Sequence, residues 1–292
     1  MTGVETRYFV GTGQTAGDLC LGAAKRLLDR LHWQPGSVSA IIFVSQTPDQ
    51  RLPATACRLH GALGLSPTCQ AFDVSLGCSG YVYGVWLAAA LINAGCGRIL
   101  LLAGDTSSRM VDPADRSTAL LFGDAGSATG IEADRAAPPA YFVLGTEGAG
   151  AGHIAVAGGG FRDPDGSEAL IINGSEVFGF TLRAVPKLIR STLEQAGQKI
   201  EDIDIFALHQ ANRFMLRHIA RKLDIAPERA PINIDRFGNT SSASIPLLLC
   251  TDCAERLTQA PQRVMLAGFG VGFSWGAACF QLQPLVCAEL IH

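Results

Sequence analysis

The sequence predicts an α/β fold in layers, built from two related halves. Residues 98–105 (RILLLAGD) resemble residues 262–269 (QRVMLAGF), which gives an offset of 164 from residue 98 to residue 262. The same offset places residues 40–46 (AIIFVSQ) on residues 204–210 (DIFALHQ). These segments are short and almost continuously apolar, as is typical of strands buried on both faces of a sheet. Such strands need helices on both sides, so two sheets between layers of helices are expected.

The remaining elements follow in the same order in each half. Residues 21–33 and 185–197 carry apolar side chains at i, i+3 and i+4 spacing, which predicts two equivalent helices. Residues 123–132 match residues 273–282, which predicts two equivalent closing strands. This last match has an offset of 150 from residue 123 to residue 273, so the first copy carries an extra segment at about residues 109–122.

The repeat divides the chain into an N-terminal half, residues 1–134, and a C-terminal half, residues 141–292. Between them lies RAAPPA, residues 135–140. This joint is too short for a free linker, so we expect one compact unit.

Composition excludes several classes of protein. The 292 residues are 48% hydrophobic and 17% charged, which excludes a disordered chain. A net charge of −3 argues against a nucleic-acid partner. The longest apolar run, residues 82–92, is too short to span a membrane, and the first residues lack a signal-peptide pattern. We therefore expect a cytoplasmic protein without a membrane partner.

The cysteines predict reduced thiols. There are nine, an odd number at irregular spacing, which does not make a disulfide framework. Cys250 and Cys253 form a single C-x-x-C pair without further ligands nearby, so no metal site is expected.

Cys78 is the candidate nucleophile. Residues 71–92 predict a strand that ends near Val74, a tight turn of small residues, and a helix that begins at about Cys78. A helix N-terminus favours the thiolate, so we expect a thiol pKa below its ordinary value of about 8.5. The alternative is a small buried core residue, which we expect of the other cysteines.

Two polar residues follow predicted strands of the second half. His209 ends the apolar segment IFAL, at the edge of a sheet where α/β active sites form. Asn239 lies in the turn FGNTSSAS. By the repeat, the first-half equivalent of His209 is Ser45, and the second-half equivalent of Cys78 is Ser242. The two halves repeat the scaffold, but only one of the two equivalent positions in each pair carries a candidate catalytic residue. We expect the other histidines to be structural or surface residues: His32, His60, His153, His218 and His292.

Five segments resemble, in order, the signatures of ketoacyl synthase III, a branch of the thiolase superfamily: DVSLGCSGY, DPADRSTALLFGDAGSA, HQANRFM, GNTSSASIP and GFGVGFSWG. The resemblance spans almost the whole chain and implies the thiolase-like five-layered αβαβα fold. It also implies that Cys78 accepts an acyl group and forms a triad with His209 and Asn239. Thiolases proper use a second cysteine and elongating ketosynthases a second histidine, so Asn239 selects this third class.

The implied activity is a decarboxylating condensation of an acyl-CoA primer with a malonyl thioester, which gives a 3-oxoacyl thioester. The Cys78 thiolate would hold the acyl group, while His209 and Asn239 would stabilise the enolate. The backbone N–H groups of Cys78 and of the turn at Val271 would form the oxyanion hole. Many relatives carry glycine where this chain has Val271. No cofactor is expected, because both thioesters are substrates.

The resemblance also suggests binding residues. Arg116 resembles a residue that contacts the coenzyme A nucleotide, and Asn212 one that bonds the pantetheine arm. The helix from Asn212 carries cations that would dock an acyl carrier protein or simply form a solvated face: Arg213, Arg217, Arg221 and Lys222. Leu52 falls where relatives place a bulky residue in the partner subunit's acyl pocket, which implies a homodimer and an altered primer.

Two other functions are compatible with the sequence. The acyl group on Cys78 could pass to an amine or hydroxyl with His209 as base. The chain could also be a non-catalytic partner of a second ketosynthase subunit, although such subunits have usually lost the cysteine. Fatty-acid initiation and a dedicated pathway, polyketide or surface glycan, are both compatible with the motifs.

The start of the chain resembles a point about 35 residues into typical relatives. The counterpart of the strand-like residues 141–148 would then precede Met1. We expect either a start codon placed too late or a natural truncation that weakens coenzyme binding. An unpaired sheet edge should also cost stability.

Overall fold

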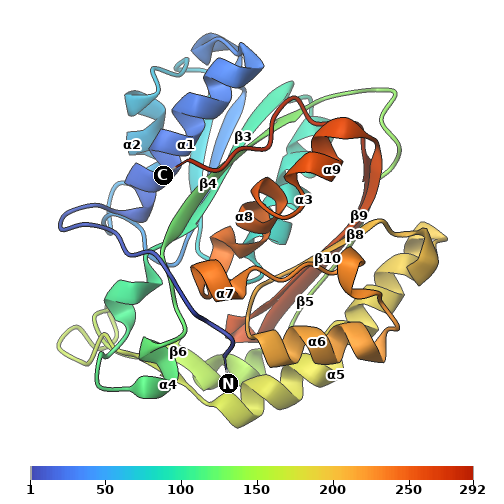
Figure 1. Ribbon diagram of the computed structural model, residues 1–292. Coiled ribbons are helices and arrows are strands. Elements are labelled where there is room, and N and C mark those ends of the chain that lie inside the picture. Colours follow the sequence, from blue (N-terminus) through green and yellow to red (C-terminus); the bar gives the residue numbers. More distant parts are fainter. Residues whose placement is uncertain (1, 292) are drawn as a thin grey trace.

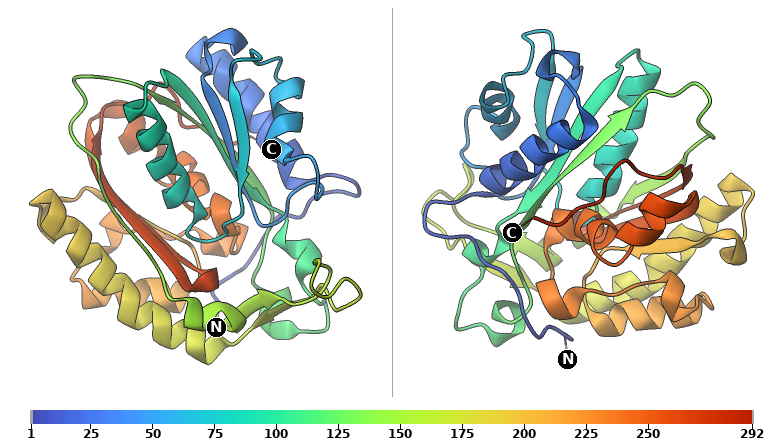
Figure 2. Two further views of the ribbon diagram at one scale, coloured as in Figure 1. Left: turned by 180° about the vertical axis from the view of Figure 1, so that it is seen from behind. Right: turned by 45° about the horizontal axis from the view of Figure 1, so that its top comes forward.

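The computed structural model describes residues 2–291 and shows five alternating layers of helices and sheets (Figure 1). Two four-stranded sheets lie on either side of a central pair of helices, and further helices cover the outer face of each sheet (Figure 2). The αβαβα fold expected from the sequence is confirmed.

The first sheet has the strand order β2-β1-β3-β4. Its central strand β1 (Ala40–Val44) is parallel to β2 (Gln70–Val74) and to β3 (Arg98–Asp105), while β4 (Ala125–Glu132) runs antiparallel to β3. All five residues of β1 are buried, because helices pack on both faces of this strand.

The second sheet has the strand order β5-β10-β9-β8. Strand β8 (Ile205–Leu208) is parallel to β9 (Gln262–Gly270), and β10 (Ser274–Leu282) is antiparallel both to β9 and to β5 (Tyr141–Thr146). The set β8, β9 and β10 therefore repeats the pairing of β1, β3 and β4. The sheets differ at their edges, since β5 covers β10 whereas β4 is the last strand of its sheet within the described residues.

Helices α3 (Gly80–Asn93) and α8 (Ser244–Cys250) form the central layer. Because α3 is almost entirely apolar, it can be buried between two sheets. Gly84 allows α3 to approach β3 closely, since a Cβ there would lie 2.6 Å from a methyl carbon of Leu101. Helix α3 begins two residues later than the sequence predicted.

The outer helices are amphipathic. Helices α1 (Ala16–Leu31) and α2 (Thr55–Ala62) cover the first sheet, and α5 (Gly174–Ala196) and α6 (Arg213–Lys222) cover the second. A capping box between Thr15 and Asp18 begins α1.

Shorter elements complete the fold: α4 (Arg116–Ala119), α7 (Ile234–Phe237), α9 (Ala254–Gln259), β6 (Ile154–Val156) and β7 (Leu170–Ile172). Helix α4 lies in the extra segment of the first half, and β6 and β7 form an antiparallel hairpin. Over residues 2–291, we find no helix with the length and apolar character needed to cross a membrane.

Candidate active site

One cavity of about 590 Å³ brings Cys78, His209 and Asn239 together. Gly270 and Val271 of the turn after β9 line the same cavity. Its outer walls are largely apolar and come from α5, from α6 and from the β6–β7 hairpin: Ile154, Leu170, Ile172, Val177, Phe178 and Met215. The strand ends of both halves thus meet at a space that could hold an extended ligand.

Cys78 lies in the turn between β2 and α3, just before the first helical turn. The Ser241 hydroxyl and the backbone N–H groups of Cys78 and Val271 lie near its sulfur and act to lower the pKa of the thiol. Burial, and after it the carboxylate of Asp105, nevertheless raise the pKa of the Cys78 thiol to about 12. The pKa lowering that we expected from the helix N-terminus is therefore wrong, because burial outweighs the donors.

The two backbone N–H groups near the sulfur are the ones that we expected to form the oxyanion hole. Gly270 makes this approach possible, since a Cβ there would lie 2.8 Å from Cys78 Cβ and 3.0 Å from its Sγ. Val271 is not among the residues with a positive φ, so a side chain is tolerated at this position. The position that many relatives fill with glycine thus keeps its donor.

His209 follows β8 and is only 1% exposed. Its Nδ1 lies 2.7 Å from Ser244 Oγ, and its ring packs edge-on against Phe269 with 5.5 Å between centroids. Burial lowers the pKa of His209 to about 3, so the imidazole is neutral near pH 7. A neutral imidazole can donate one hydrogen bond and accept another without adding a charge to the cavity.

Asn239 is oriented by its own turn. Its backbone bonds Leu121 O at 2.9 Å and Gly123 N at 3.1 Å, and its Oδ1 accepts the Ser241 N–H at 2.9 Å. Because Oδ1 is occupied, the amide Nδ2 is the donor available to the cavity. This is the polarity that an enolate oxygen requires.

The candidate binding residues are distributed unevenly around the mouth. Asn212 lines the cavity and caps α6 by accepting the Phe214 N–H at 2.8 Å. Arg116 is exposed at the start of α4, next to Ser117, which lines the cavity. Arg217 is exposed on α6.

Arg213 differs from the expectation of a docking cation. Its guanidinium lies 3.7 Å from the carboxylate of Glu5 and 3.8 Å from that of Asp235, and it is only partly exposed. These contacts tie α6 to the N-terminal segment. The charge of Arg213 is therefore already compensated within the chain.

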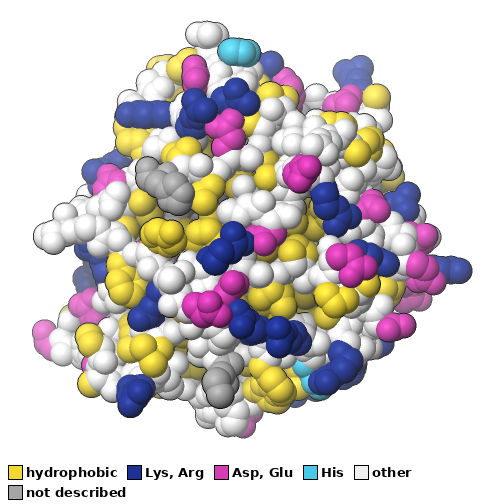
Figure 3. Space-filling model, in the orientation of Figure 1, with side chains coloured by type: hydrophobic (Ala, Val, Ile, Leu, Met, Phe, Trp, Pro, Cys, Tyr) yellow, Lys and Arg dark blue, Asp and Glu magenta, His cyan; other side chains and the backbone are white. Residues whose placement is uncertain are grey.

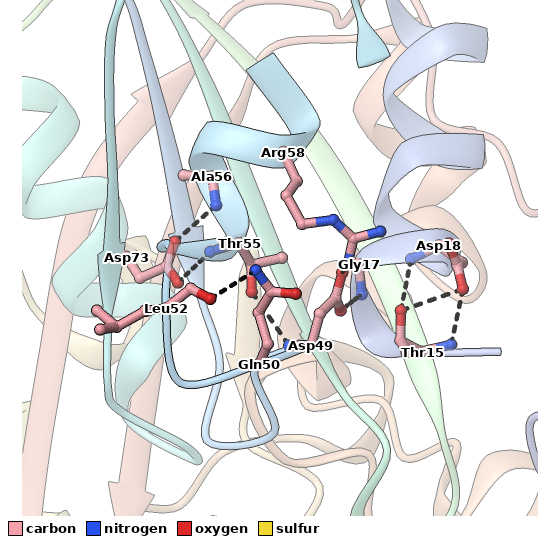
Figure 4. Close-up of polar contacts among 10 residues, drawn as sticks. All are labelled: Thr15, Gly17, Asp18, Asp49, Gln50, Leu52, Thr55, Ala56, Arg58 and Asp73. Atoms are coloured by element: carbon pink, nitrogen blue, oxygen red, sulfur yellow. Dashed lines mark hydrogen bonds and ion pairs between the residues drawn. The ribbon is translucent and has the colours of Figure 1, made fainter. Parts of the chain in front are cut away.

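Leu52 lies outside the cavity of its own chain and is 84% exposed. Figure 4 shows that its loop is held by polar contacts. Asp49 accepts the Gly17 N–H at 3.3 Å and an Arg58 N–H at 2.9 Å, and Gln50 Nε2 donates to Leu52 O at 2.8 Å. The loop is thus ordered although its apolar tip has little cover.

The polar groups behind the candidate triad were not predicted from the sequence. Ser244 bonds His209, the Ser241 hydroxyl lies near the sulfur of Cys78, and Asp105 is fully buried nearby. Ser241 and Ser244 stand in the quoted GNTSSASIP segment, but nothing in the spacing tells which hydroxyl points inward.

Among residues 2–291, no group of three or more His, Cys, Asp or Glu is placed to hold a metal ion.

Comparison with known proteins matches both halves. Residues 72–148 match the family model described as 3-oxoacyl-[acyl-carrier-protein (ACP)] synthase III, and residues 193–282 match the model of its C-terminal part. A beta-ketoacyl-[acyl-carrier-protein] synthase III of Streptomyces coelicolor is 38% identical over 281 residues, which cover 95% of this chain and 82% of that protein. A crystal structure of a 3-oxoacyl-(acyl-carrier protein) synthase from Burkholderia xenovorans superposes with a TM-score of 0.98 at 46% identity, covering 100% of this chain and 86% of that one.

The layered fold with a cysteine between its two sheets is that of the thiolase-fold acyltransferases. Within this class, the chain belongs to the 3-oxoacyl-[acyl-carrier-protein] synthase III family. The family resemblance inferred from the five sequence segments is confirmed, and the protein is an enzyme of the beta-ketoacyl synthase type.

Proposed function

We propose that this enzyme joins an acyl-CoA primer to a malonyl thioester, with Cys78, His209 and Asn239 as its catalytic residues. The observation that carries the proposal is that these three residues line one cavity. Two backbone N–H groups lie near the Cys78 sulfur, and the imidazole of His209 is neutral. Each of these groups matches one requirement of the condensation.

The first half-reaction loads the primer. Cys78 Sγ attacks the thioester carbonyl, its proton passes to neutral His209, and the coenzyme A thiolate leaves and takes that proton. The N–H groups of Cys78 and Val271 stabilise the tetrahedral oxyanion. Because the pKa of the Cys78 thiol is raised to about 12, the resting residue is protonated and a base must take its proton during the attack.

The second half-reaction extends the primer. The malonyl thioester loses CO₂, and the electron pair moves to the thioester carbonyl as an enolate. The imidazole N–H of His209 and Nδ2 of Asn239 donate hydrogen bonds to the enolate oxygen. The enolate carbon then attacks the Cys78 thioester, which releases the 3-oxoacyl thioester and the Cys78 thiolate, and the thiolate takes up a proton. These steps use only the two thioester substrates.

An acyl carrier protein would dock on a basic groove beside the mouth. Figure 3 shows Lys and Arg side chains over the part of this face that carries α6. Side chains of α5 and α6 line an open groove of about 520 Å³ that includes four cations: Arg183, Lys187, Arg190 and Lys222. An acidic carrier helix is complementary to this surface, although Arg183 pairs with Glu147 at 3.2 Å, as Arg213 pairs with Glu5 and Asp235.

Charge reversal tests the docking surface. Lys187→Glu should raise the KM for malonyl-carrier protein and leave the KM for malonyl-CoA unchanged, because only the carrier contacts the groove. Lys25→Glu, on the distant helix α1, is the matched control and should change neither constant. Equal effects of both variants on the carrier substrate would contradict docking at the groove.

The homodimer expected from the sequence would form at the edge strand β2. The residues of β2 are not fully buried. Two large apolar side chains are strongly exposed, Leu52 at 84% and Phe161 at 89%. Their loops are in contact, because the Arg51 guanidinium lies over the Phe161 ring. A second copy would cover this edge and these side chains. Sedimentation at micromolar protein should give twice the chain mass, and a concentration-independent monomer would contradict the proposal.

The function itself is tested by intact mass and by CO₂ release. Incubation with a panel of acyl-CoAs should add one acyl mass for the preferred primer, and malonyl thioester should then release CO₂ and give the 3-oxoacyl product. Loading without decarboxylation would instead support transfer to an amine or hydroxyl. A chain that neither loads nor decarboxylates would support a non-catalytic partner subunit.

A further inference from the structure

Asp105 is a buried carboxylate that no step of the proposed reaction uses. It ends β3, is fully buried, and accepts five hydrogen bonds. From the loop after β1 come Gln46 N at 2.7 Å, Ser45 Oγ at 3.1 Å and Thr47 Oγ1 at 3.4 Å. From the other half come Ser242 N at 3.0 Å and Ser242 Oγ at 2.7 Å. One carboxylate thus joins the two halves of the molecule.

The internal repeat shows what this cluster corresponds to. Ser242 is the counterpart of Cys78, Ser45 is the counterpart of His209, and Asp105 is the counterpart of Phe269. In the candidate active site, Phe269 packs against the His209 ring. In the pseudo-symmetric copy, Ser45, Asp105 and Ser242 form a network of hydrogen bonds around one carboxylate. The second, inactive copy of the site has become a polar anchor.

This anchor lies directly behind the turn that carries Asn239. Ser242, which bonds Asp105 through both its N–H and its hydroxyl, follows Ser241 in the chain. Ser241 has a φ of 50°, a conformation that a non-glycine residue adopts only when neighbouring contacts hold it. Its N–H bonds Asn239 Oδ1, and its hydroxyl lies near both the Cys78 sulfur and the Asp105 carboxylate. Movement of this turn would displace both the enolate donor and the donor to the nucleophile.

We infer that Asp105 is a positioning residue, which holds the turn of residues 239–242 so that Asn239 and Ser241 stay aimed at the reacting atoms. The inference rests on the proposed function. Asp105 touches no substrate, and it acts through Ser242 and Ser241. Burial raises the pKa of Asp105 itself, whereas the donors around it favour the carboxylate. In that charged form Asp105 raises the pKa of the Cys78 thiol, which links the anchor to the nucleophile by a second route.

Three variants separate positioning from simple structural support. Asp105→Asn keeps the shape of the side chain but replaces one acceptor oxygen by an NH₂ donor. That donor must then face another donor, either the Gln46 N–H or the Ser242 N–H and hydroxyl. Ser242→Ala removes one hydroxyl donor from the same carboxylate and keeps the protein testable if Asp105→Asn does not fold. Asp124→Asn is the matched control, because Asp124 is also buried and accepts bonds from Ser108 and Val10, none of which reaches residues 239–242.

The first measurement compares the two half-reactions in each folded variant. Asp105→Asn should slow malonyl decarboxylation by about 10-fold or more while primer loading falls much less, since a small displacement of a donor is costly. Ser242→Ala should show the same imbalance in weaker form, and Asp124→Asn should keep the wild-type ratio. A wild-type ratio in Asp105→Asn, or the same imbalance in Asp124→Asn, would overturn the inference.

The second measurement needs no turnover. Alkylation of Cys78 by iodoacetamide, followed against pH, should move to lower pH in Asp105→Asn because the nearby charge is removed. It should not move in Asp124→Asn. If wild-type protein fails to decarboxylate malonyl thioester, the proposed function fails, yet this profile still decides whether Asp105 is coupled to Cys78. An unchanged profile in Asp105→Asn would refute the coupling.

Discussion

Replacement of Asn239 by alanine should separate the two half-reactions of the enzyme. Asn239 Oδ1 is held by the Ser241 N–H at 2.9 Å, so Nδ2 is the group that faces the cavity. The enolate forms only during decarboxylation. Loading of Cys78 relies instead on the N–H groups of Cys78 and Val271, which the substitution leaves in place.

The magnitude follows from these contacts. One lost oxyanion donor costs about 3 kcal/mol in the transition state, which is about a 10²-fold loss of decarboxylation rate. The Ser241 N–H also loses its buried acceptor, which costs about 1–3 kcal/mol of folding free energy. The variant should therefore melt earlier, and rates should be measured well below its Tm.

The assay follows acyl mass on Cys78 and CO₂ release from malonyl thioester in the same preparation. Thr240→Val is the matched control in the neighbouring position, because the buried Thr240 hydroxyl has no hydrogen-bond partner within the described chain. It should keep both rates and melt at the same or a higher temperature. If Asn239→Ala slowed loading and decarboxylation equally, the enolate role would be refuted and transfer to an amine or hydroxyl favoured.

Three further outcomes are expected. Cys78→Ala should abolish the acyl mass shift and leave the fold intact, since it deletes the nucleophile and little volume, and comparable loading of another cysteine would contradict that role. Gly270→Ala should slow loading by about 10-fold or more, because its Cβ would lie 2.8 Å from Cys78 Cβ; unchanged loading would show that the turn can move aside. His209 should make the protein less stable as the pH falls below 6.5: the unfolded histidine binds a proton there, but the folded one stays neutral down to about pH 3. The loss is about 1.4 kcal/mol per pH unit in urea unfolding, and His209→Gln should lack it between pH 6.5 and 5.

The fold and the identity of the candidate triad could be predicted from the sequence because their signals are local. A buried strand such as Ala40–Val44 is apolar at every position, and the same order of elements occurs twice in the chain. The nucleophile, His209 and Asn239 stand in short segments whose residue types are distinctive. Helix starts were predicted less well, since α3 begins two residues after Cys78.

The chemical state of the site was decided by tertiary structure. The pKa of Cys78 depends on burial and on groups from Asp105, Ser241 and Val271, which lie far from it in sequence. The pairing of Arg213 with Glu5 and Asp235 likewise joins separate parts of the chain. Periodicity and motifs determine which residues form each element. Electrostatic free energies depend on desolvation and on distances between elements, and these exist only once the two halves have packed together.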